Sequence, residues 1–337
     1  MKLLIVTQSL DKQDPVLGFF HAWLEEFAKH AEQLTVFALR VGEYELPEHV
    51  TVVPLRRGGK NRALTVLIFL RELYVRRASY DKVFVHMNPE YVLLGGPLWK
   101  ILHKQVVLWY THKHVGLRLR LAEFFVDHIL TASKESLRLR SKKVRIMGHG
   151  IAMPETVVRK PVSRSAVHIV TVGRIAPSKR IRELVRALGV LSLRNIPFSA
   201  SIVGVPITTK DEQYEKDIMR ELGQATYREQ VRFVGAVRHE DLPQVLAQAD
   251  VFVNLSLTGS LDKAVLEALI MRVPVVSTNE AFESLLRPEG LFIEDVDEET
   301  VADAIVGANG MSIDTLSDTV RKAHSLSALI PAILRVL

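Results

Sequence analysis

The sequence predicts an α/β protein made of two doubly wound domains, each built on a parallel β-sheet. Its 337 residues are 48% hydrophobic and 24% charged, which is typical of a globular chain with more than one hydrophobic core. Short, continuously apolar runs alternate with amphipathic segments, the pattern of parallel strands that helices cover on both faces. The alternation stops at Met153–Arg164, a segment with two prolines, and then begins again.

The first half of the chain supplies the strands of one sheet. Amphipathic segments such as Gly18–His30 and Ala63–Arg77 lie between several of them and are expected to be helices. We therefore expect residues 1–157 to form the first domain. The expected strands are Leu3–Thr7, Leu34–Leu39, Val50–Pro54, Lys82–His86, Gln105–Trp109, His128–Ala132 and Val144–Met147.

The second half repeats the alternation, and we expect residues 158–323 to form the second domain. The remaining residues, 324–337, are expected to form a C-terminal helix that packs back on the first domain. The expected strands of the second domain are Val167–Val172, Ala200–Val205, Val231–Val234, Val251–Asn254 and Val273–Ser277. Its expected helices are Arg180–Arg194, Glu212–Leu222, Leu242–Gln248 and Ala264–Met271.

Composition excludes several kinds of chemistry. The chain has no cysteine, so disulfides, thiolate metal sites and cysteine nucleophiles are excluded, and a reducing cytoplasm is the expected compartment. No apolar run approaches the roughly eighteen residues of a membrane span. Positive charge is concentrated in residues 1–158, where the net charge is +8, against −2 in residues 159–337. An anionic partner is therefore expected to meet the first half alone.

A basic turn follows the strand Val167–Val172. Gly173 allows a tight turn there, and Arg174 and Lys179 precede the next helix. An arginine fork and a lysine point charge at the carboxyl end of a strand suit a diphosphate. A solvated surface turn is the competing interpretation of this segment alone.

A second turn, about eighty residues later, follows the strand Val251–Asn254. The helix that follows begins near Lys263, with Asp262 as its expected N-cap. Its free N–H groups and partial positive charge favour phosphate. Glu267 lies one turn into this helix between apolar neighbours, where its carboxylate can accept hydrogen bonds from the hydroxyls of a ribose.

Together these segments resemble the donor domain of the retaining GT-B glycosyltransferases, specifically glycosyltransferase family 4. The resemblance is collinear from about Val167 to Ser277. The segments that carry it are the Gly173, Arg174 and Lys179 turn, Ile202-Val203-Gly204, Val231–Leu242, Ala249-Asp250-Val251, Leu266-Glu267-Ala268 and Pro274-Val275-Val276. It implies the GT-B fold, in which two Rossmann-like doubly wound domains face a central cleft.

The resemblance also implies roles for individual residues. Arg174 and Lys179 would hold the donor diphosphate next to Gly173, and Glu267 would hold the ribose. A loop would cradle the phosphates and the sugar; it comprises Gly259, Ser260, Leu261, Asp262 and Lys263. The family usually has a second glutamate where this chain has Gly259. A different sugar contact, a different donor and lost activity all remain open, in that order of preference.

The first half matches the family more loosely. Gly18 stands where the family has a glycine loop near the donor phosphates, and His112 resembles a cleft histidine that contacts the sugar. Because His86 and Asn88 end a strand on the same edge of the sheet, we expect them at the acceptor. His86 could equally be a structural residue.

The implied reaction is transfer of a sugar from a nucleotide diphosphate sugar to a glycan or lipid-linked acceptor, with retention of configuration. Arg174, Lys179 and His112 would be the catalytic residues. No cofactor or nucleic acid is expected. No metal ion is expected either, because His112-Lys113-His114 lacks further ligands at useful spacing. Two alternatives remain open: a GT-B nucleotide-sugar epimerase or hydrolase, and a non-catalytic sugar-nucleotide binder.

The basic excess of the first half also predicts contact with an anionic membrane surface. Cations follow or interrupt apolar residues in 64–77, 117–120 and 138–145. Such interleaving favours a peripheral position on the cytoplasmic face of a membrane, near a lipid-linked acceptor. Ordinary core helices with solvated cations are the competing interpretation.

Overall fold

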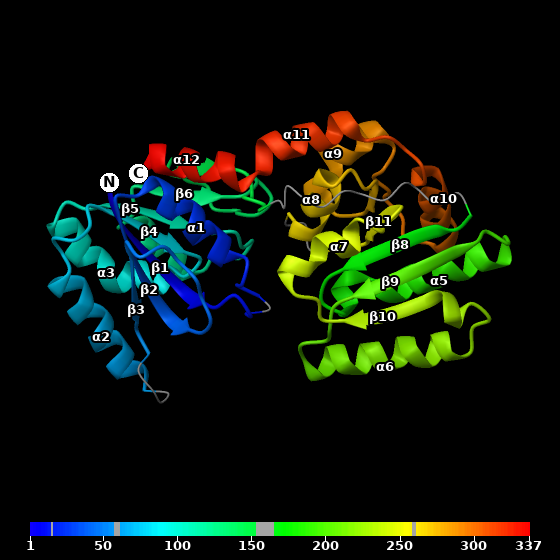
Figure 1. Ribbon diagram of the computed structural model, residues 1–337, viewed down its shortest axis with the longest axis horizontal. Coiled ribbons are helices and arrows are strands. Elements are labelled where there is room, and N and C mark those ends of the chain that lie inside the picture. Colours follow the sequence, from blue (N-terminus) through cyan, green and yellow to red (C-terminus); the bar gives the residue numbers. More distant parts are fainter. Residues whose placement is uncertain (15, 57–60, 153–164, 258–260) are drawn as a thin grey trace. The chain divides into compact units, whose positions relative to one another are not determined.

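The chain folds into two compact units, which we describe separately (Figure 1). The coordinates are a computed structural model that describes residues 1–14, 16–56, 61–152, 165–257 and 261–337. Unit 1 comprises Met1–Ala152 and Ala323–Leu337, and unit 2 comprises Met153–Lys322. The last fifteen residues therefore belong to the first unit, although they follow the second in sequence.

Unit 1 is built on a parallel sheet of seven strands in the order β3-β2-β1-β4-β5-β6-β7. Continuous apolar runs form the central strands because helices cover both faces, and Leu3–Val6 of β1 are fully buried. The strands are β1 (Lys2–Leu10), β2 (Gln33–Val41), β3 (Val50–Pro54), β4 (Lys82–His86), β5 (Gln105–Trp109), β6 (His128–Thr131) and β7 (Val144–Ile146).

The helices of unit 1 are α1 (Phe20–His30), α2 (Arg62–Val75), α3 (Pro89–Ile101), α4 (Leu117–Glu123) and α12 (Leu326–Val336). Helix α12 packs on α1 and closes this unit (Figure 1). Backbone hydrogen bonds hold its start, since the Ile151 N–H donates to the His324 carbonyl at 2.7 Å. The Lys82 ammonium donates to the Leu337 carbonyl at its end.

Helix α3 is an element that the sequence pattern did not predict. It contains Gly95, Gly96 and Pro97, which normally weaken a helix. A Cβ on Gly95 would stand 2.6 Å from the Trp99 ring, and one on Gly96 would stand 2.6 Å from the side chain of Phe125. The glycines therefore let two large aromatic side chains pack closely against the helix.

Unit 2 is built on a parallel sheet of five strands in the order β10-β9-β8-β11-β12. The two parallel sheets confirm the predicted fold class. The strands are β8 (Val167–Val172), β9 (Phe198–Val203), β10 (Val231–Gly235), β11 (Val251–Asn254) and β12 (Val275–Ser277). The α-helices are α5 (Ile181–Leu193), α6 (Thr209–Gly223), α7 (Leu242–Leu246), α8 (Lys263–Ile270), α9 (Glu283–Leu286), α10 (Glu298–Ala308) and α11 (Asp314–His324).

Strand order positions the candidate site of unit 2. Strands β8 and β11 are hydrogen-bonded neighbours, with Val251 opposite Ile169. Because both strands run in the same direction, the turns that follow them leave the same edge of the sheet. The turn after β8 carries Arg174 and Lys179, and the segment after β11 leads to α8.

Candidate active site

The turn after β8 is shaped by Gly173. Its φ of +150° lies where side chains are disfavoured, and its N–H donates to the Val203 carbonyl at 2.9 Å. The Lys179 side chain lies over it, since a Cβ on Gly173 would stand 3.3 Å from Lys179 Cε. The absent side chain therefore gives Lys179 its place above the end of β8.

The ammonium group of Lys179 supplies positive charge at the carboxyl edge of the sheet in unit 2. Lys179 Nζ donates to Asp262 Oδ2 at 2.5 Å, and Asn254 Nδ2 donates to the same oxygen at 3.0 Å. The side chains of Lys179 and Asp262 are only 15% and 24% exposed, so water screens the pair weakly. Asp262 therefore joins the turn after β8 to the start of α8.

This arrangement changes the role expected for Asp262. It occupies the N-cap position of α8, but its side chain makes no capping hydrogen bond, because its carboxylate is turned to Lys179 and Asn254. The first N–H groups of an eight-residue helix are thus left without the cap that Asp262 would supply. They remain available to an anion.

Glu267 lies one turn further along α8 and is 7% exposed. Burial raises its pKa to about 7, an effect that the positive charge of Lys263 partly offsets. His239 Nδ1 lies 3.8 Å from Glu267 Oε1, too far for a hydrogen bond. Within the described part of the chain, no donor hydrogen-bonds to Oε1 although the atom is buried. This oxygen is therefore able to accept a hydrogen bond from a ligand.

Lys263 adds a second buried charge to this site. Its Nζ atom has almost no accessible surface, and burial holds the pKa of the ammonium well below its ordinary value of 10.5. Burial also lowers the pKa of the nearby His239 imidazole, with a smaller effect from the Lys263 charge. A phosphate bound beside Lys263 would favour the charged form and so raise this pKa.

Arg174 and Lys179 are the two cations predicted to hold the donor diphosphate, and we call them the cation clamp. Arg174 is the more exposed of the two. Its side chain is 43% exposed, and Nε lies 3.8 Å from Asp211 Oδ2. Asp211 belongs to the capping box of α6 with Thr208, which fixes its position. Of the predicted cradle, Leu261 is half-buried just before α8, whereas Gly259 and Ser260 lie outside the described residues.

In unit 1, the carboxyl edge of the sheet forms a cavity of about 820 Å³. Asn88 and His112 both line it, together with Met87 and Tyr110. His112 Nδ1 accepts a hydrogen bond from the His114 N–H at 3.1 Å. The neutral ring therefore carries its proton on Nε2, which gives His112 a donor for a hydroxyl group.

Gly18 has a structural role in the loop beside this cavity. A Cβ at this position would stand 2.7 Å from the Asp14 carbonyl oxygen and 2.8 Å from that of Lys12. These two carbonyl groups leave no room for a side chain, which explains the glycine. Its neighbours Val16 and Leu17 line the cavity, and their N–H groups donate to the Asp14 carboxylate.

His86 does not fit the acceptor role expected for it. The residue is 1% exposed, and its ring stacks on Phe20 with the ring centroids 3.9 Å apart. Its Nδ1 lies 3.3 Å from the Thr7 hydroxyl. His86 is therefore a core residue at the end of β4, and Asn88, two residues later, is the one that reaches the cavity.

Metal ligands are sparse in the parts of the chain that the structure describes. No group of three His, Asp or Glu side chains is arranged to hold a metal ion among those residues. The Asp-x-Asp sequence at Asp295 and Asp297 serves a helix, because Asp297 Oδ1 caps α10 by accepting from the Thr300 N–H at 2.9 Å.

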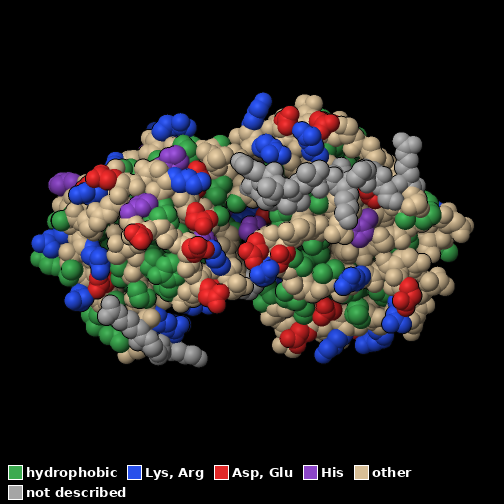
Figure 2. Space-filling model, in the orientation of Figure 1, with side chains coloured by type: hydrophobic (Ala, Val, Ile, Leu, Met, Phe, Trp, Pro, Cys, Tyr) green, Lys and Arg blue, Asp and Glu red, His purple; other side chains and the backbone are tan. Residues whose placement is uncertain are grey.

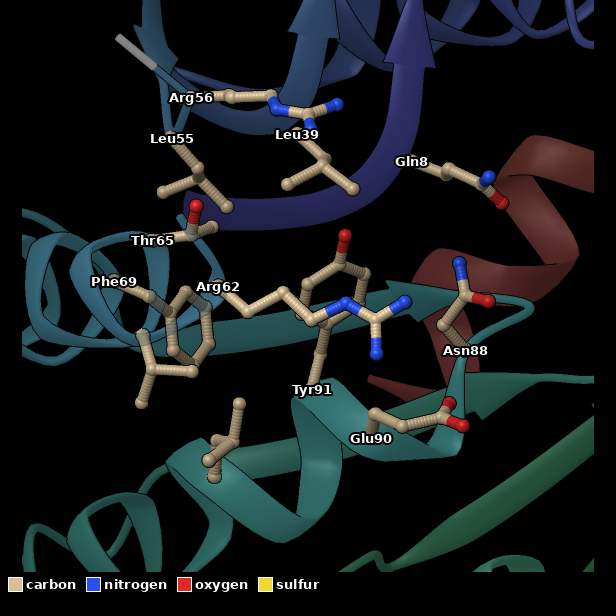
Figure 3. A pocket seen from close by; sticks show the side chains of 12 residues that line it. Gln8, Leu39, Leu55, Arg56, Arg62, Thr65, Phe69, Asn88, Glu90 and Tyr91 are labelled. Atoms are coloured by element: carbon tan, nitrogen blue, oxygen red, sulfur yellow. The ribbon is translucent and has the colours of Figure 1, made fainter. Parts of the chain in front are cut away.

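Two features of the sites were not predicted from the sequence. Asn254 orients Asp262, and its signal was only a polar residue at the carboxyl end of a buried strand. A second cavity, beneath α2 in unit 1, has a volume of about 540 Å³ and carries no recognisable motif (Figure 3).

Comparison with known proteins relates the chain to glycosyltransferases. Residues 166–308 match the family model for Glycosyl transferases group 1. A 65-residue segment is 38% identical to a subunit of the human phosphatidylinositol N-acetylglucosaminyltransferase; the segment covers 19% of this chain and 13% of that protein. The chain therefore matches only about an eighth of the length of this curated relative.

Solved structures share the whole fold at low sequence identity. Anabaena HepE in complex with UDP and glucose is 15% identical, with a TM-score of 0.75 over 99% of this chain and 98% of that one. Sucrose-phosphate synthase from Thermosynechococcus elongatus is also 15% identical, with a TM-score of 0.75 over 100% and 98%. UDP-GlcNAc 2-epimerase from Methanocaldococcus jannaschii is 13% identical, with a TM-score of 0.60 over 100% and 99%.

Residues 166–308 of this chain are similar to the group 1 glycosyltransferases, and the chain has the fold of GT-B glycosyltransferase structures. An epimerase shares this fold, so the fold alone does not distinguish sugar transfer from other reactions of nucleotide sugars.

Proposed function

We propose that this protein transfers a sugar from a nucleoside diphosphate sugar, bound by unit 2, to an acceptor bound by unit 1, with retention of anomeric configuration. The buried Glu267 carboxylate carries the proposal, because its Oε1 needs a donor and the hydroxyls of a ribose supply one. Lys179 and the uncapped start of α8 stand on the neighbouring turn and suit the diphosphate of the same ligand.

The same groups would stabilise the departing nucleoside diphosphate. As the bond to the sugar breaks, negative charge grows on the diphosphate oxygen. Lys179, Arg174 and the N–H groups of α8 are already fixed when this charge appears, so little reorganisation is required. We propose that these cations make a divalent metal ion unnecessary. His112 would donate from Nε2 to a hydroxyl of the transferred sugar.

Gly259 leaves the position of the usual sugar-binding glutamate without a carboxylate. Asp262 is the nearest carboxylate in the described part of this segment, but Lys179 and Asn254 already hold it. A bound diphosphate would compete for Lys179 and so release Asp262 toward the sugar. We therefore favour an altered sugar contact over lost activity.

A membrane surface is part of the proposal. Helix α2 exposes Leu64, Leu67 and Tyr74 by 46%, 64% and 58%, and α4 exposes Leu117 by 71%. Figure 2 shows hydrophobic side chains among arginines and lysines on the surface of unit 1. Among the described residues, no helix is long and apolar enough to span a membrane. We propose peripheral binding at the cytoplasmic face, next to a glycan or lipid-linked acceptor.

Donor turnover with and without acceptor tests the proposed reaction. The purified protein is incubated with UDP-, GDP- and ADP-sugars, and with or without a membrane lipid and glycan extract. Release of nucleoside diphosphate that needs the extract, and that continues in excess chelator, supports transfer by the cation clamp. The anomeric configuration of the product, read by NMR, tests retention.

Four outcomes would contradict parts of the proposal. Equal release without extract would favour a hydrolase, and an isomerised donor would favour an epimerase. Binding of a nucleotide sugar with no turnover in any extract would favour a non-catalytic binder. Loss of turnover in chelator, restored by manganese or magnesium, would overturn metal independence.

A further inference from the structure

The cavity beneath α2 is a second recess in unit 1. It lies near the carboxyl ends of β1, β2 and β3 and is closed by α2 and α3 (Figure 3). Its volume of about 540 Å³ is within the range of small-molecule sites. No residue that the donor chemistry requires lines it.

The walls of this cavity are mainly apolar. Leu39 and Leu55 come from the sheet side, Val66 and Phe69 from α2, and Leu94 from α3. Burial raises the pKa of the Tyr91 phenol, a further lining residue, to about 12, with help from the charge of Glu90, so the ring stays neutral. The apolar side chains named above offer no hydrogen bonds to the hydroxyls of a glycan, whereas a hydrocarbon chain needs none.

Two arginines stand at the rim. Figure 3 shows Arg62 reaching across the opening toward Asn88 and Glu90, and Arg56 on the opposite side near Leu39. The one carboxylate of the lining, Glu90, is held by Arg118, whose Nη1 donates to Glu90 Oε1 at 2.6 Å. The rim is therefore net positive, and guanidinium groups bind phosphate well.

The cavity adjoins the one that His112 lines. Gln8, Asn88 and Glu90 border both recesses. The larger recess is more polar, since Asp11, Gln13 and Asp14 also line it. One molecule could thus place a hydroxyl-bearing end beside His112 and an apolar end beneath α2, with an anionic group between them.

We propose that the cavity beneath α2 binds the hydrocarbon chain of an acceptor whose phosphate group lies at Arg56 and Arg62. This inference rests on the proposed function, because it names the class of acceptor as an alkyl or isoprenyl phosphate whose head group carries the hydroxyl that receives the sugar. The outer side of α2 presents Leu64 and Leu67 to the surroundings, so the same helix would line the cavity and contact the lipid layer that supplies the chain.

Alkyl phosphates test the inference without knowledge of the natural acceptor. Octyl and decyl phosphate, below their micelle concentrations, are titrated into the protein in a calorimeter. Affinity should rise about fourfold for each added methylene until the cavity is full. Inorganic phosphate and decyltrimethylammonium should bind at least about tenfold more weakly than decyl phosphate.

Two substitutions on α2 form a matched pair. Thr65→Trp fills the cavity from a half-buried lining position, and Leu67→Trp adds the same ring to the outer side of the helix. Decyl phosphate binding should fall at least tenfold in the first variant and change less than about twofold in the second. Equal loss in both, or loss only in Leu67→Trp, would place the chain on the outer surface and overturn the inference.

Nucleotide binding separates failure of this inference from failure of the proposed function. A nucleoside diphosphate should bind the wild type and Thr65→Trp equally, since its site lies in unit 2. If it binds and no alkyl phosphate does, the acceptor class is wrong and the donor site stands. If inorganic phosphate binds as tightly as decyl phosphate, Arg56 and Arg62 form a plain anion site and the chain has no part in it.

Discussion

The candidate donor site of unit 2 and the apolar cavity of unit 1 are assembled in different ways. In unit 2, two short turns after neighbouring strands bring together charged groups that already contact one another, such as Lys179 and Asp262. In unit 1, the cavity beneath α2 collects apolar side chains from two helices and from residues in or just after two strands. The comparison teaches that fixed charges select the ligand of the donor site in unit 2, whereas shape and hydrophobicity select the ligand of the cavity in unit 1.

The largest expected effect is at the fixed charges of unit 2. Lys179→Ala should lower turnover by about 10²–10³-fold, a loss of roughly 3–4 kcal/mol of transition-state stabilisation, and Arg174→Ala should act in the same direction. The control is Arg186→Ala, which removes a cation that pairs with Glu221 on the surface of the same unit. Steady-state kinetics with a saturating acceptor measures the effect. Near wild-type turnover in both clamp variants would remove the donor assignment.

Substitutions of His86 and His112, both in unit 1, should have different effects on kcat. His112→Ala removes the Nε2 donor from the larger cavity and should lower kcat about tenfold, the worth of one hydrogen bond. His86→Phe keeps the aromatic stack on Phe20 and should change kcat less than about threefold. Thermal melts show whether each variant is folded. A larger loss of kcat in folded His86→Phe than in His112→Ala would reverse our interpretation of this edge.

A pH dependence should follow from the buried carboxylate. Burial raises the pKa of Glu267 from 4.5 to about 7, so its charged fraction grows from about a tenth at pH 6 to about nine tenths at pH 8. The carboxylate accepts ribose hydroxyls more strongly when charged, so nucleoside diphosphate affinity should rise about tenfold over this range. Glu267→Gln should abolish this rise and keep the smaller one due to titration of the diphosphate. Calorimetric titrations at several pH values measure it; parallel profiles in the two proteins would contradict the assignment.

The titration of Glu267 should change stability in the opposite direction: nucleotide affinity rises with pH, whereas the free energy of unfolding falls. Because the folded-state pKa of Glu267 is raised, its contribution to the free energy of unfolding is fully present below pH 4.5 and is lost as pH rises through about 7. The ligand-free wild type should therefore lose stability relative to Glu267→Gln between pH 5 and pH 8. Urea denaturation at those pH values checks the sign.

Membrane binding should show the smallest effect per residue. Arg138, Arg140 and Lys142 are exposed, whereas Lys143 donates to the carbonyls of Glu123 and Val126 at 2.7 Å and is structural. Neutralising the three exposed cations should weaken binding to anionic liposomes by about fivefold for each charge. Sedimentation at graded anionic lipid and salt measures this, and the same number of neutralised cations on α6 is the control. Protein that stays in the supernatant at every composition would exclude the membrane surface.

Sequence patterns predicted one site better than the other for a physical reason. The site of unit 2 could be predicted from a local pattern. Gly173 and Lys179 lie six residues apart in one turn, and only the strand before that turn had to be recognised. Helix α3 was missed because Gly95, Gly96 and Pro97 oppose a helix locally and only packing against Trp99 and Phe125 makes it favourable.

The cavity beneath α2 was missed for a related reason. Its lining residues look like ordinary core residues in sequence, and one of its walls is the unpredicted helix α3. His86 was misplaced because the end of a strand does not reveal on which side a ring packs, and Phe20 decides that. Long-range packing, rather than any local pattern, fixes both features.

Hydrogen exchange in the presence of a nucleoside diphosphate tests the central claim most directly. The diphosphate that binds tightest among UDP, GDP and ADP is added without acceptor, and exchange is read by mass spectrometry. We predict slower exchange in peptides that cover residues 172–180 and 261–270 of unit 2, and no change in those that cover α2 and α3. Protection confined to unit 1, or absent from both unit 2 segments despite binding, would contradict the assignment of the donor to Lys179, Glu267 and the start of α8.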